Sequence, residues 1–405
     1  MGAGTAQRGA CLLISGKVRK NMEFVVFAGV LLLLFIFMIV QELIQTKNQE
    51  KLFKKYLREN YGKEPPKEYS LERFARLGSY LERHKEEKQL DDITWNDLGM
   101  DEVFRRIDRT YSAAGEEYLY YTLRNISCGR EALEHLEEVV NWLQEQENIK
   151  VRIQLLMKRL GHLGKYSLYD YLDNLDYLGE RSNRKIVLGN LLYLPFLLLL
   201  FVQPAMGTIG IVLCMLWHIM TYFREKKVIE PYIISFAYVL RLIDVCEELE
   251  KQKIPVYRRE LDELREALKS LRELRRGAYW VMAGNQGKIG GNPLDILADY
   301  LRMILHLDIF QFNRMLEKLR KKTGQVETML AITGYLDMAI SVGGFRKSLE
   351  GYCIPKLEED TEKAFLHMKK GWHPLLSQPV KNSIRADRGI LLTGSNASGK
   401  STFLK

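Results

Sequence analysis

The sequence lacks both a cysteine framework and a metal-binding pattern. Its five cysteines lie far apart without a Cys-x-x-Cys pair, and its seven histidines form neither a close pair nor a His-Glu-x-x-His motif. This pattern argues against a disulfide scaffold and a zinc site, and it indicates reduced thiols facing a cytosol-like compartment. No tandem repeat or low-complexity tract is evident. With 47% hydrophobic residues among 405, the chain can build cores for two or three domains.

Acidic residues are too few to balance the basic ones. Lys and Arg number 60 against 51 Asp and Glu, a formal net charge of +9. Such a charge is compatible with nucleic acid, nucleotide or anionic lipid as a partner. It is equally expected of a chain whose basic residues flank membrane spans. Composition alone leaves both interpretations open.

Charged side chains are absent from one run near the N-terminus. Phe24 to Val40 comprises 17 residues without a charged or strongly polar side chain. A membrane-spanning helix needs roughly 20 apolar residues, so we expect residues 1–45 to form an N-terminal segment with a transmembrane helix. A cleaved signal peptide is the alternative. The run is longer than a usual signal-peptide core and no small-x-small cleavage site follows it, which favours an anchor.

A second apolar region, Ile186 to Met220, is interrupted at its middle by Gln203-Pro204. Each half has about the length of one bilayer crossing, so a transmembrane hairpin is expected within residues 186–222. A buried helical hairpin inside a soluble core is the alternative. Basic residues flank the region on both sides, which by the positive-inside rule puts both ends in the cytoplasm. They are Arg181, Arg184 and Lys185 before it, and Arg224, Lys226 and Lys227 after it. The protein is therefore expected to be a multi-pass protein of the cell membrane.

Helical patterns dominate the remainder, so the predicted fold class is mainly α. Residues 46–90 are expected to form a cytoplasmic linker, 91–185 the first part of a helical body and 223–370 its second part. Within the second part, leucines follow a heptad-like seam that predicts a long packed helix: Leu261, Leu264, Leu268 and Leu271. Basic residues with few compensating acids follow at Lys318, Arg320, Lys321 and Lys322. These four are therefore the better candidates for phosphate contacts, and we take them as candidate nucleic-acid contacts.

The segment from Gly394 to Ser401, GSNASGKS, satisfies the G-x-x-x-x-G-K-[ST] pattern of a phosphate-binding loop. Gly394, Ser395, Asn396, Ala397, Ser398 and Gly399 are small or short enough for backbone N–H groups to point into one hollow. Lys400 is expected to reach the β and γ phosphates of ATP, and Ser401 to ligate Mg²⁺. Thr402 is expected to open the helix that follows, whose N-terminus favours an anion. The apolar residues 389–393 predict a strand before the loop, so 371–405 reads as the beginning of an α/β P-loop domain.

The same residues resemble a known family. LLTGSNASGKSTFLK resembles the P-loop of MutS-family ATPases, and GWHPLL, Gly371 to Leu376, resembles the segment that opens their ATPase domain. Asn382 stands where the family often has an asparagine before the P-loop strand. The segment from Leu98 to Arg124 resembles the start of the MutS helical core, where a small-residue turn leads into a helix ending in a basic residue. The resemblance implies that residues 223–370 are core and lever helices.

The resemblance further implies a membrane-tethered ATP-binding protein that handles double-stranded DNA, with ATP and Mg²⁺ as cofactors and a homodimer through the complete ATPase domain. In the family a Walker B region follows the P-loop, so the chain is expected to be the front part of an ATPase without hydrolytic activity of its own. A membrane anchor stands where mismatch-recognising MutS proteins carry a mismatch-reading domain, so direct mismatch reading is not expected. Two alternatives remain: a nucleotide-gated membrane scaffold, and an ABC-type transporter component.

Overall fold

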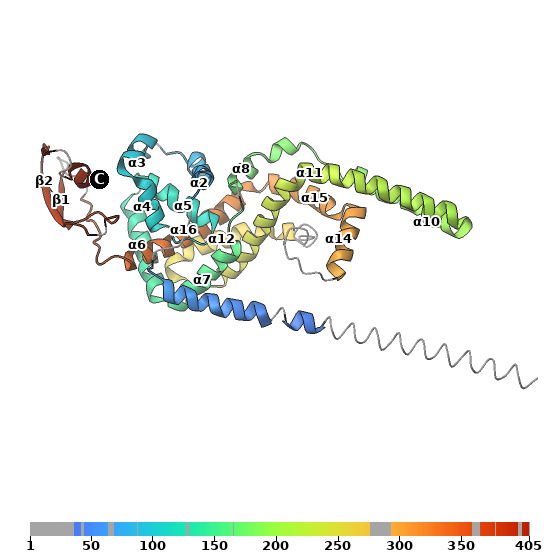
Figure 1. Ribbon diagram of the computed structural model, residues 1–405, viewed down its shortest axis with the longest axis horizontal. Helices are drawn as coiled ribbons and strands as arrows, with labels where there is room; N and C mark the ends of the chain where they lie inside the picture. The colour runs from blue at the N-terminus through green and yellow to red at the C-terminus, as the bar shows by residue number, and fades with distance from the viewer. Residues whose placement is uncertain are drawn as a thin grey trace, which may run out of the picture. The chain divides into compact units, whose positions relative to one another are not determined.

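The computed structural model describes residues 36–41, 44–63, 69–86, 88–126, 129–164, 166–275, 293–358, 365–376, 378–395 and 399–404. The chain divides into two units, Met1–Asn60 and Tyr61–Lys405. The protein is mainly helical, in agreement with the sequence pattern (Figure 1).

In the first unit, residues 36–41 and 44–60 are helical. Ile36 to Val40, the part of the expected N-terminal span that the structure describes, have exposed apolar side chains. Residues 24–35 of that span lie outside the described residues.

The second unit holds the helical body, an apolar hairpin and a pair of strands. The first helices are α2 (Leu71–Arg83), α3 (Asp92–Leu98), α4 (Met100–Ile107), α5 (Ala113–Arg124), α6 (Arg130–Glu145), α7 (Glu147–Leu160) and α8 (Leu168–Asp173). The hairpin follows with α9 (Arg184–Leu191), α10 (Tyr193–Val202) and α11 (Pro204–Glu250). The body is completed by α12 (Arg258–Leu271), α14 (Pro293–Leu305), α15 (Leu307–Arg320) and α16 (Thr323–Lys347). The remaining elements are the 3₁₀ helices η1 (Leu175–Leu178), η2 (Pro255–Tyr257) and η3 (Arg272–Arg275), the strands β1 (Leu366–Gly371) and β2 (Asn382–Ala386), and α17 (Lys400–Leu404).

Helix α16 is the centre of the body and packs against α5, α6, α7 and α12. Its inward side chains, such as Met329 and Leu336, are fully buried. The start of α5 is fastened to it by Asp337, which accepts hydrogen bonds from the backbone N–H and the hydroxyl of Ser112 at 2.8 and 2.6 Å. As the resemblance implied, α5 follows a small-residue turn, with Ser112 as its N-cap, and ends at the basic residue Arg124.

Helix α2 lies within residues 46–90, where a linker was predicted, yet it belongs to the body. Leu77 and Leu81 on its apolar face are buried, and the helix packs against α5. Arg76 Nη2 lies 2.7 Å from Glu116 Oε2 of α5, and both side chains are buried. The amphipathic pattern of α2 therefore outweighs the prolines that precede it, because only packing on α5 buries its leucines.

The leucine seam of α12 is confirmed. All four predicted leucines are buried, and the helix packs against α16 and the C-terminal half of α11. The charged residues between them lie on the outer face and form local ion pairs, such as Arg265 with Asp262 at 2.7 Å.

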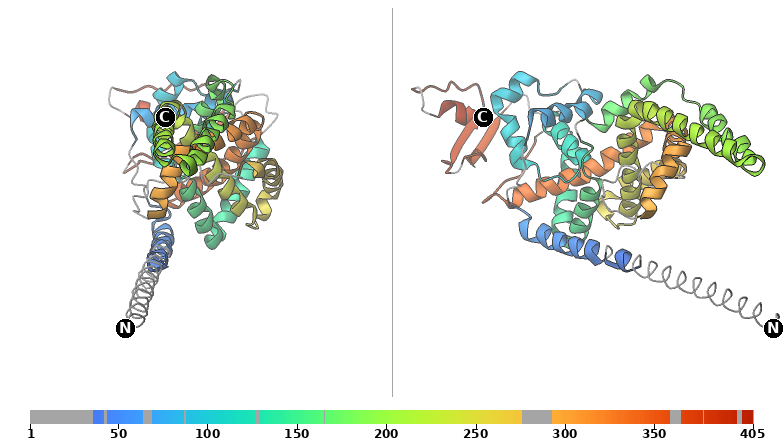
Figure 2. Two further views of the ribbon diagram at one scale, coloured as in Figure 1. Left: turned by 90° about the vertical axis from the view of Figure 1, so that its right-hand side faces the viewer. Right: turned by 45° about the vertical axis from the view of Figure 1, so that its right-hand side comes forward.

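The apolar hairpin is broken at the predicted place, because α10 ends at Val202 and α11 begins at Pro204. The two helices pack closely, since a Cβ added at Gly207 would lie 2.6 Å from the backbone nitrogen of Leu200. Helix α11 then continues without interruption through Pro231 to Glu250, so no linker separates the hairpin from the body at the boundary predicted after residue 222 (Figure 2).

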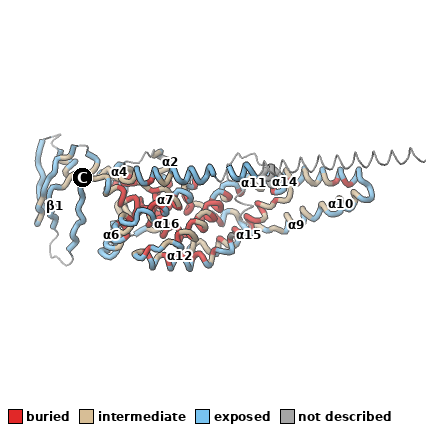
Figure 3. Tube along the Cα trace, turned by 90° about the horizontal axis from the view of Figure 1, so that it is seen from below, coloured by how far each residue is buried: buried red, intermediate tan, exposed pale blue. Residues whose placement is uncertain are grey.

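Three helical segments in the described residues are long and apolar enough to cross a membrane: Arg184–Val202, Pro204–Glu250 and Thr323–Lys347. Their surroundings differ. In the third, α16, 72% of the apolar window is buried in protein, whereas in the first only 6% is buried. The hairpin exposes large side chains such as Leu198, Phe201 and Met220. Most of α10 is accordingly drawn in the colours of exposed and intermediate residues in Figure 3. Burial in the protein core thus explains why α16 is apolar. It does not explain why the hairpin is apolar, because the hairpin is mostly exposed.

Candidate nucleotide-binding loop

Strands β1 and β2 precede the loop and pair antiparallel with each other, Met368 opposite Ile384. Asn382, singled out by the resemblance, begins β2, and its side-chain amide donates to the carbonyl of Val380 at 3.1 Å. The strand predicted at residues 389–393 is not formed. These residues carry no ladder hydrogen bonds in the described structure, and Leu391 is 88% exposed. An apolar strand of this kind forms only when neighbouring strands supply partners and helices cover it, and β1 and β2 pair with one another.

The end of the loop has the backbone geometry that its sequence requires. Gly399 adopts φ +83°, in the left-handed region that glycine populates without steric cost. Helix α17 begins at the next residue, and Phe403 N–H donates to the Gly399 carbonyl at 2.9 Å. The predicted helix after the loop is therefore present, and its first residue is Lys400.

The side chain of Lys400 points back towards the start of the motif. Lys400 Nζ donates a hydrogen bond to the carbonyl oxygen of Gly394, the first residue of the motif. The ammonium group therefore lies beside the first residue of the motif. In that position it can exchange a carbonyl oxygen for a phosphate oxygen, because an ionised acceptor makes the stronger hydrogen bond.

The other predicted loop residues are placed in part. Gly394 and Ser395 are exposed, and Ser401 and Thr402 lie exposed in the first turn of α17. Asn396, Ala397 and Ser398 lie outside the described residues. Within the part of the chain that is described, no group of three His, Cys, Asp or Glu side chains could hold a metal ion.

The four basic residues proposed to contact nucleic acid are not equivalent. Lys318 Nζ lies 3.1 Å from Glu273, and Lys322 donates to the carbonyl of Ser270. Arg320 donates to two backbone carbonyls, those of Leu175 and Gly179, at 2.7 and 2.9 Å. Three of the four thus hold neighbouring segments of the body together, and only the fourth, Lys321, is exposed without an ion pair to any described residue.

The chain contains one Phe-x-Glu triplet, Phe223 to Glu225, the pattern that stacks on the mispaired base in mismatch-recognising MutS proteins. It lies in the middle of α11, and Arg181 donates to the Glu225 carboxylate.

Comparisons of this chain with protein-family models, with curated proteins and with solved structures find no match.

Proposed function

We propose that the chain is part of a membrane-anchored, MutS-like protein that binds ATP with Mg²⁺ at residues 394–402. The observation that carries the proposal is that a G-x-x-x-x-G-K-S segment has two matching structural features. Its last glycine, Gly399, has a left-handed backbone conformation, and Lys400 donates a hydrogen bond to the carbonyl of its first glycine, Gly394. A structural turn that matched the motif by chance would have no need of both features.

Each residue has a separate role in this proposal. Backbone N–H groups from Ser395 to Gly399 surround the β-phosphate, and Lys400 neutralises the β and γ phosphates. The Ser401 hydroxyl ligates Mg²⁺, and the Thr402 N–H contacts the α-phosphate at the helix N-terminus. ATP hydrolysis is not assigned to these residues, because it needs an acidic group to hold Mg²⁺ and orient water.

The membrane arrangement is proposed on separate grounds. The exposed apolar surfaces of α9, α10 and the first half of α11 exceed what a water-facing helix carries, and lipid is the solvent that suits them. Arg181 and Lys226 lie at the body end of the hairpin, so the positive-inside rule puts the body in the cytoplasm and the Gln203 turn on the far side. With the N-terminal apolar run the protein would be multi-pass.

Double-stranded DNA binding and homodimer formation rest on the resemblance to MutS proteins, with Lys321 as the best-placed contact. A second candidate function is a nucleotide-gated membrane scaffold. The internal contacts of Lys318, Arg320 and Lys322 favour it, because these side chains are already engaged within the body.

The test is binding of a fluorescent ATP analogue to the full chain in lipid nanodiscs. The proposal expects saturable, Mg²⁺-dependent binding that is displaced by ATP and not by AMP. Absence of binding, or displacement by AMP that is as effective as displacement by ATP, would contradict the proposed ATP site. DNA titration of the same sample separates the two candidates, because only a DNA-handling protein has an affinity that falls steeply with salt.

A further inference from the structure

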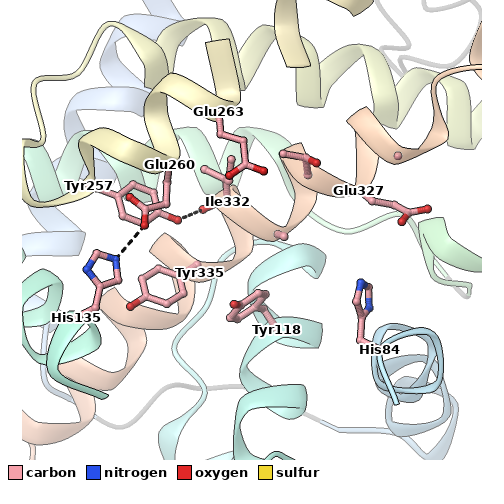
Figure 4. A pocket seen from close by; sticks show the side chains of 12 residues that line it. His84, Tyr118, His135, Tyr257, Glu260, Glu263, Glu327, Ile332 and Tyr335 are labelled. Carbon is pink, nitrogen blue, oxygen red and sulfur yellow. Dashed lines mark hydrogen bonds and ion pairs between the residues drawn. The ribbon is translucent and has the colours of Figure 1, made fainter. Parts of the chain in front are cut away.

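Helices α5, α6, α12 and α16 of the second unit surround a cavity of about 390 Å³, remote in sequence from the P-loop (Figure 4). This volume lies within the range of small-molecule sites. Half of the twelve residues that line it are tyrosines and glutamates, and one histidine lies towards each end.

Aromatic rings form one wall. The rings of Tyr257 and Tyr335 are stacked with centroids 5.5 Å apart, and Tyr118 meets Tyr335 edge-on at 5.7 Å. Tyr257 is fully buried, and its hydroxyl donates to the carbonyl of Ile332 at 3.0 Å, which fixes the ring. Rigid aromatic faces of this kind attract cations and accommodate aliphatic chains.

Three carboxylates also line the cavity. Glu260 and Glu263 are three residues apart on α12 and so share one face of the helix, while Glu327 comes from α16 (Figure 4). Glu260 lies 3.2 Å from His135 Nε2, and Glu327 lies 2.7 Å from Arg83. Among the described residues no cationic side chain lies within ion-pair distance of Glu263, which is therefore the carboxylate open to a ligand.

We propose that this cavity binds a linear polyamine. One ammonium group would pair with Glu263, and the others would approach Glu260 and Glu327 beside their partners His135 and Arg83. Its methylene segments would lie against the half-buried rings of Tyr118 and Tyr335. The spacing of carboxylates on two separate helices suits several cationic centres on one chain better than a single compact cation. A nucleotide is disfavoured because its phosphates would face carboxylates. A bare metal ion is disfavoured because no described group of three carboxylate, imidazole or thiolate ligands converges.

The experiment is isothermal titration of spermidine into the full chain in zwitterionic nanodiscs at 0.15 M salt. We expect one saturable site, and about a tenfold loss of affinity in Glu263→Gln, the size of effect typical of one lost charge-assisted contact. Glu266→Gln is the matched control: it removes the same charge from the same helix, but Glu266 pairs with Lys269 at 2.6 Å and does not line the cavity. Both side chains are exposed, so neither variant should disturb folding.

The proposal is overturned if spermidine shows no saturable binding, or if the two variants lose affinity equally. It is also overturned if Mg²⁺ displaces spermidine at equal concentration, since that would indicate diffuse attraction to surface charge. Retained binding in Glu266→Gln together with loss in Glu263→Gln supports it. This outcome is independent of nucleotide binding, because it involves no residue of the P-loop.

Discussion

The hydroxyl of Ser112 lies 2.6 Å from a carboxylate oxygen of Asp337, although 225 residues separate them in the chain. The contact fastens the N-terminus of α5 to the middle of α16, and both side chains are fully buried. A buried carboxylate that accepts several hydrogen bonds is costly to disturb, because any donor left behind has no water to replace its partner.

The fit around Asp337 can be tested at Gly115, in the first turn of α5. A Cβ at this position would lie 2.6 Å from the Cβ of Asp337, so Gly115→Ala should lower the stability of the body by about 2 kcal/mol through overpacking. Gly78→Ala, in α2, is the control: nothing lies within 4 Å of its added Cβ, and alanine should stabilise that helix by about 0.5–1 kcal/mol. The thermal midpoints should move in opposite directions. Equal shifts would contradict the packing described here.

Glu117 predicts a pH dependence of stability. Burial raises the pKa of its carboxyl to about 8, against opposing contributions from the Ser167 hydroxyl and from Arg76, and with smaller support from Glu116 and Asp170. A raised pKa in the folded state means that the folded protein binds the proton more tightly than the unfolded chain does. The resulting stability is fully present below pH 4.5 and is lost as the pH rises through about 8.

Glu117→Gln should remove that dependence, because a neutral amide oxygen can still accept from the Ser167 hydroxyl, 2.8 Å away in the wild type. The variant should match the wild type near pH 5 and exceed its thermal midpoint near pH 9. Glu134→Gln, at an exposed residue paired with Arg130, should leave the pH profile unchanged. A parallel profile in wild type and Glu117→Gln would show that Glu117 is ionised when buried.

The hairpin should depend on the small residues of α11. A leucine at Gly207 would meet the backbone of α10 at Leu200, so Gly207→Leu should separate the two helices and lower the thermal midpoint in nanodiscs. Thr208→Leu is the control, because Thr208 is exposed and its hydroxyl bonds only within its own helix, to Pro204. If both variants lowered the midpoint equally, close packing between α10 and α11 would not be the cause.

Substitution of Lys321 should affect DNA binding, whereas substitution of its basic neighbour Arg320 should affect stability. Lys321→Ala should weaken DNA binding a few-fold and reduce the slope of log affinity against log salt by about 0.9, as expected for one phosphate contact. Arg320→Ala should instead lower stability, because it leaves the carbonyls of Leu175 and Gly179 without that donor. An unchanged affinity and slope in Lys321→Ala would favour the scaffold function.

Local patterns in the sequence predicted much of this fold. The leucine seam of α12 and the helix break at Gln203 each follow from side chains within a few residues of one another. The membership of α2 in the body and the continuity of α11 were not predicted, because they depend on contacts with distant helices. The contact of Ser112 with Asp337 has no local signal at all.

The candidate loop was also predicted only in part from the sequence. The helix from Lys400 follows from the motif and its glycine, whereas a strand at residues 389–393 needs partners that its own apolar residues cannot supply. The acidic aromatic cavity also escaped prediction, because its residues come from separate helices that only the fold brings together.

The central claim is tested most directly by Mg²⁺–ATP binding to the full chain and to Lys400→Ala, with Lys381→Ala as a control that removes an exposed positive charge outside the loop. The account predicts that Lys400→Ala weakens ATP binding at least about tenfold with an unchanged thermal midpoint in the absence of nucleotide, and that Lys381→Ala binds as the wild type does. ATP binding of wild-type strength in Lys400→Ala would contradict the account.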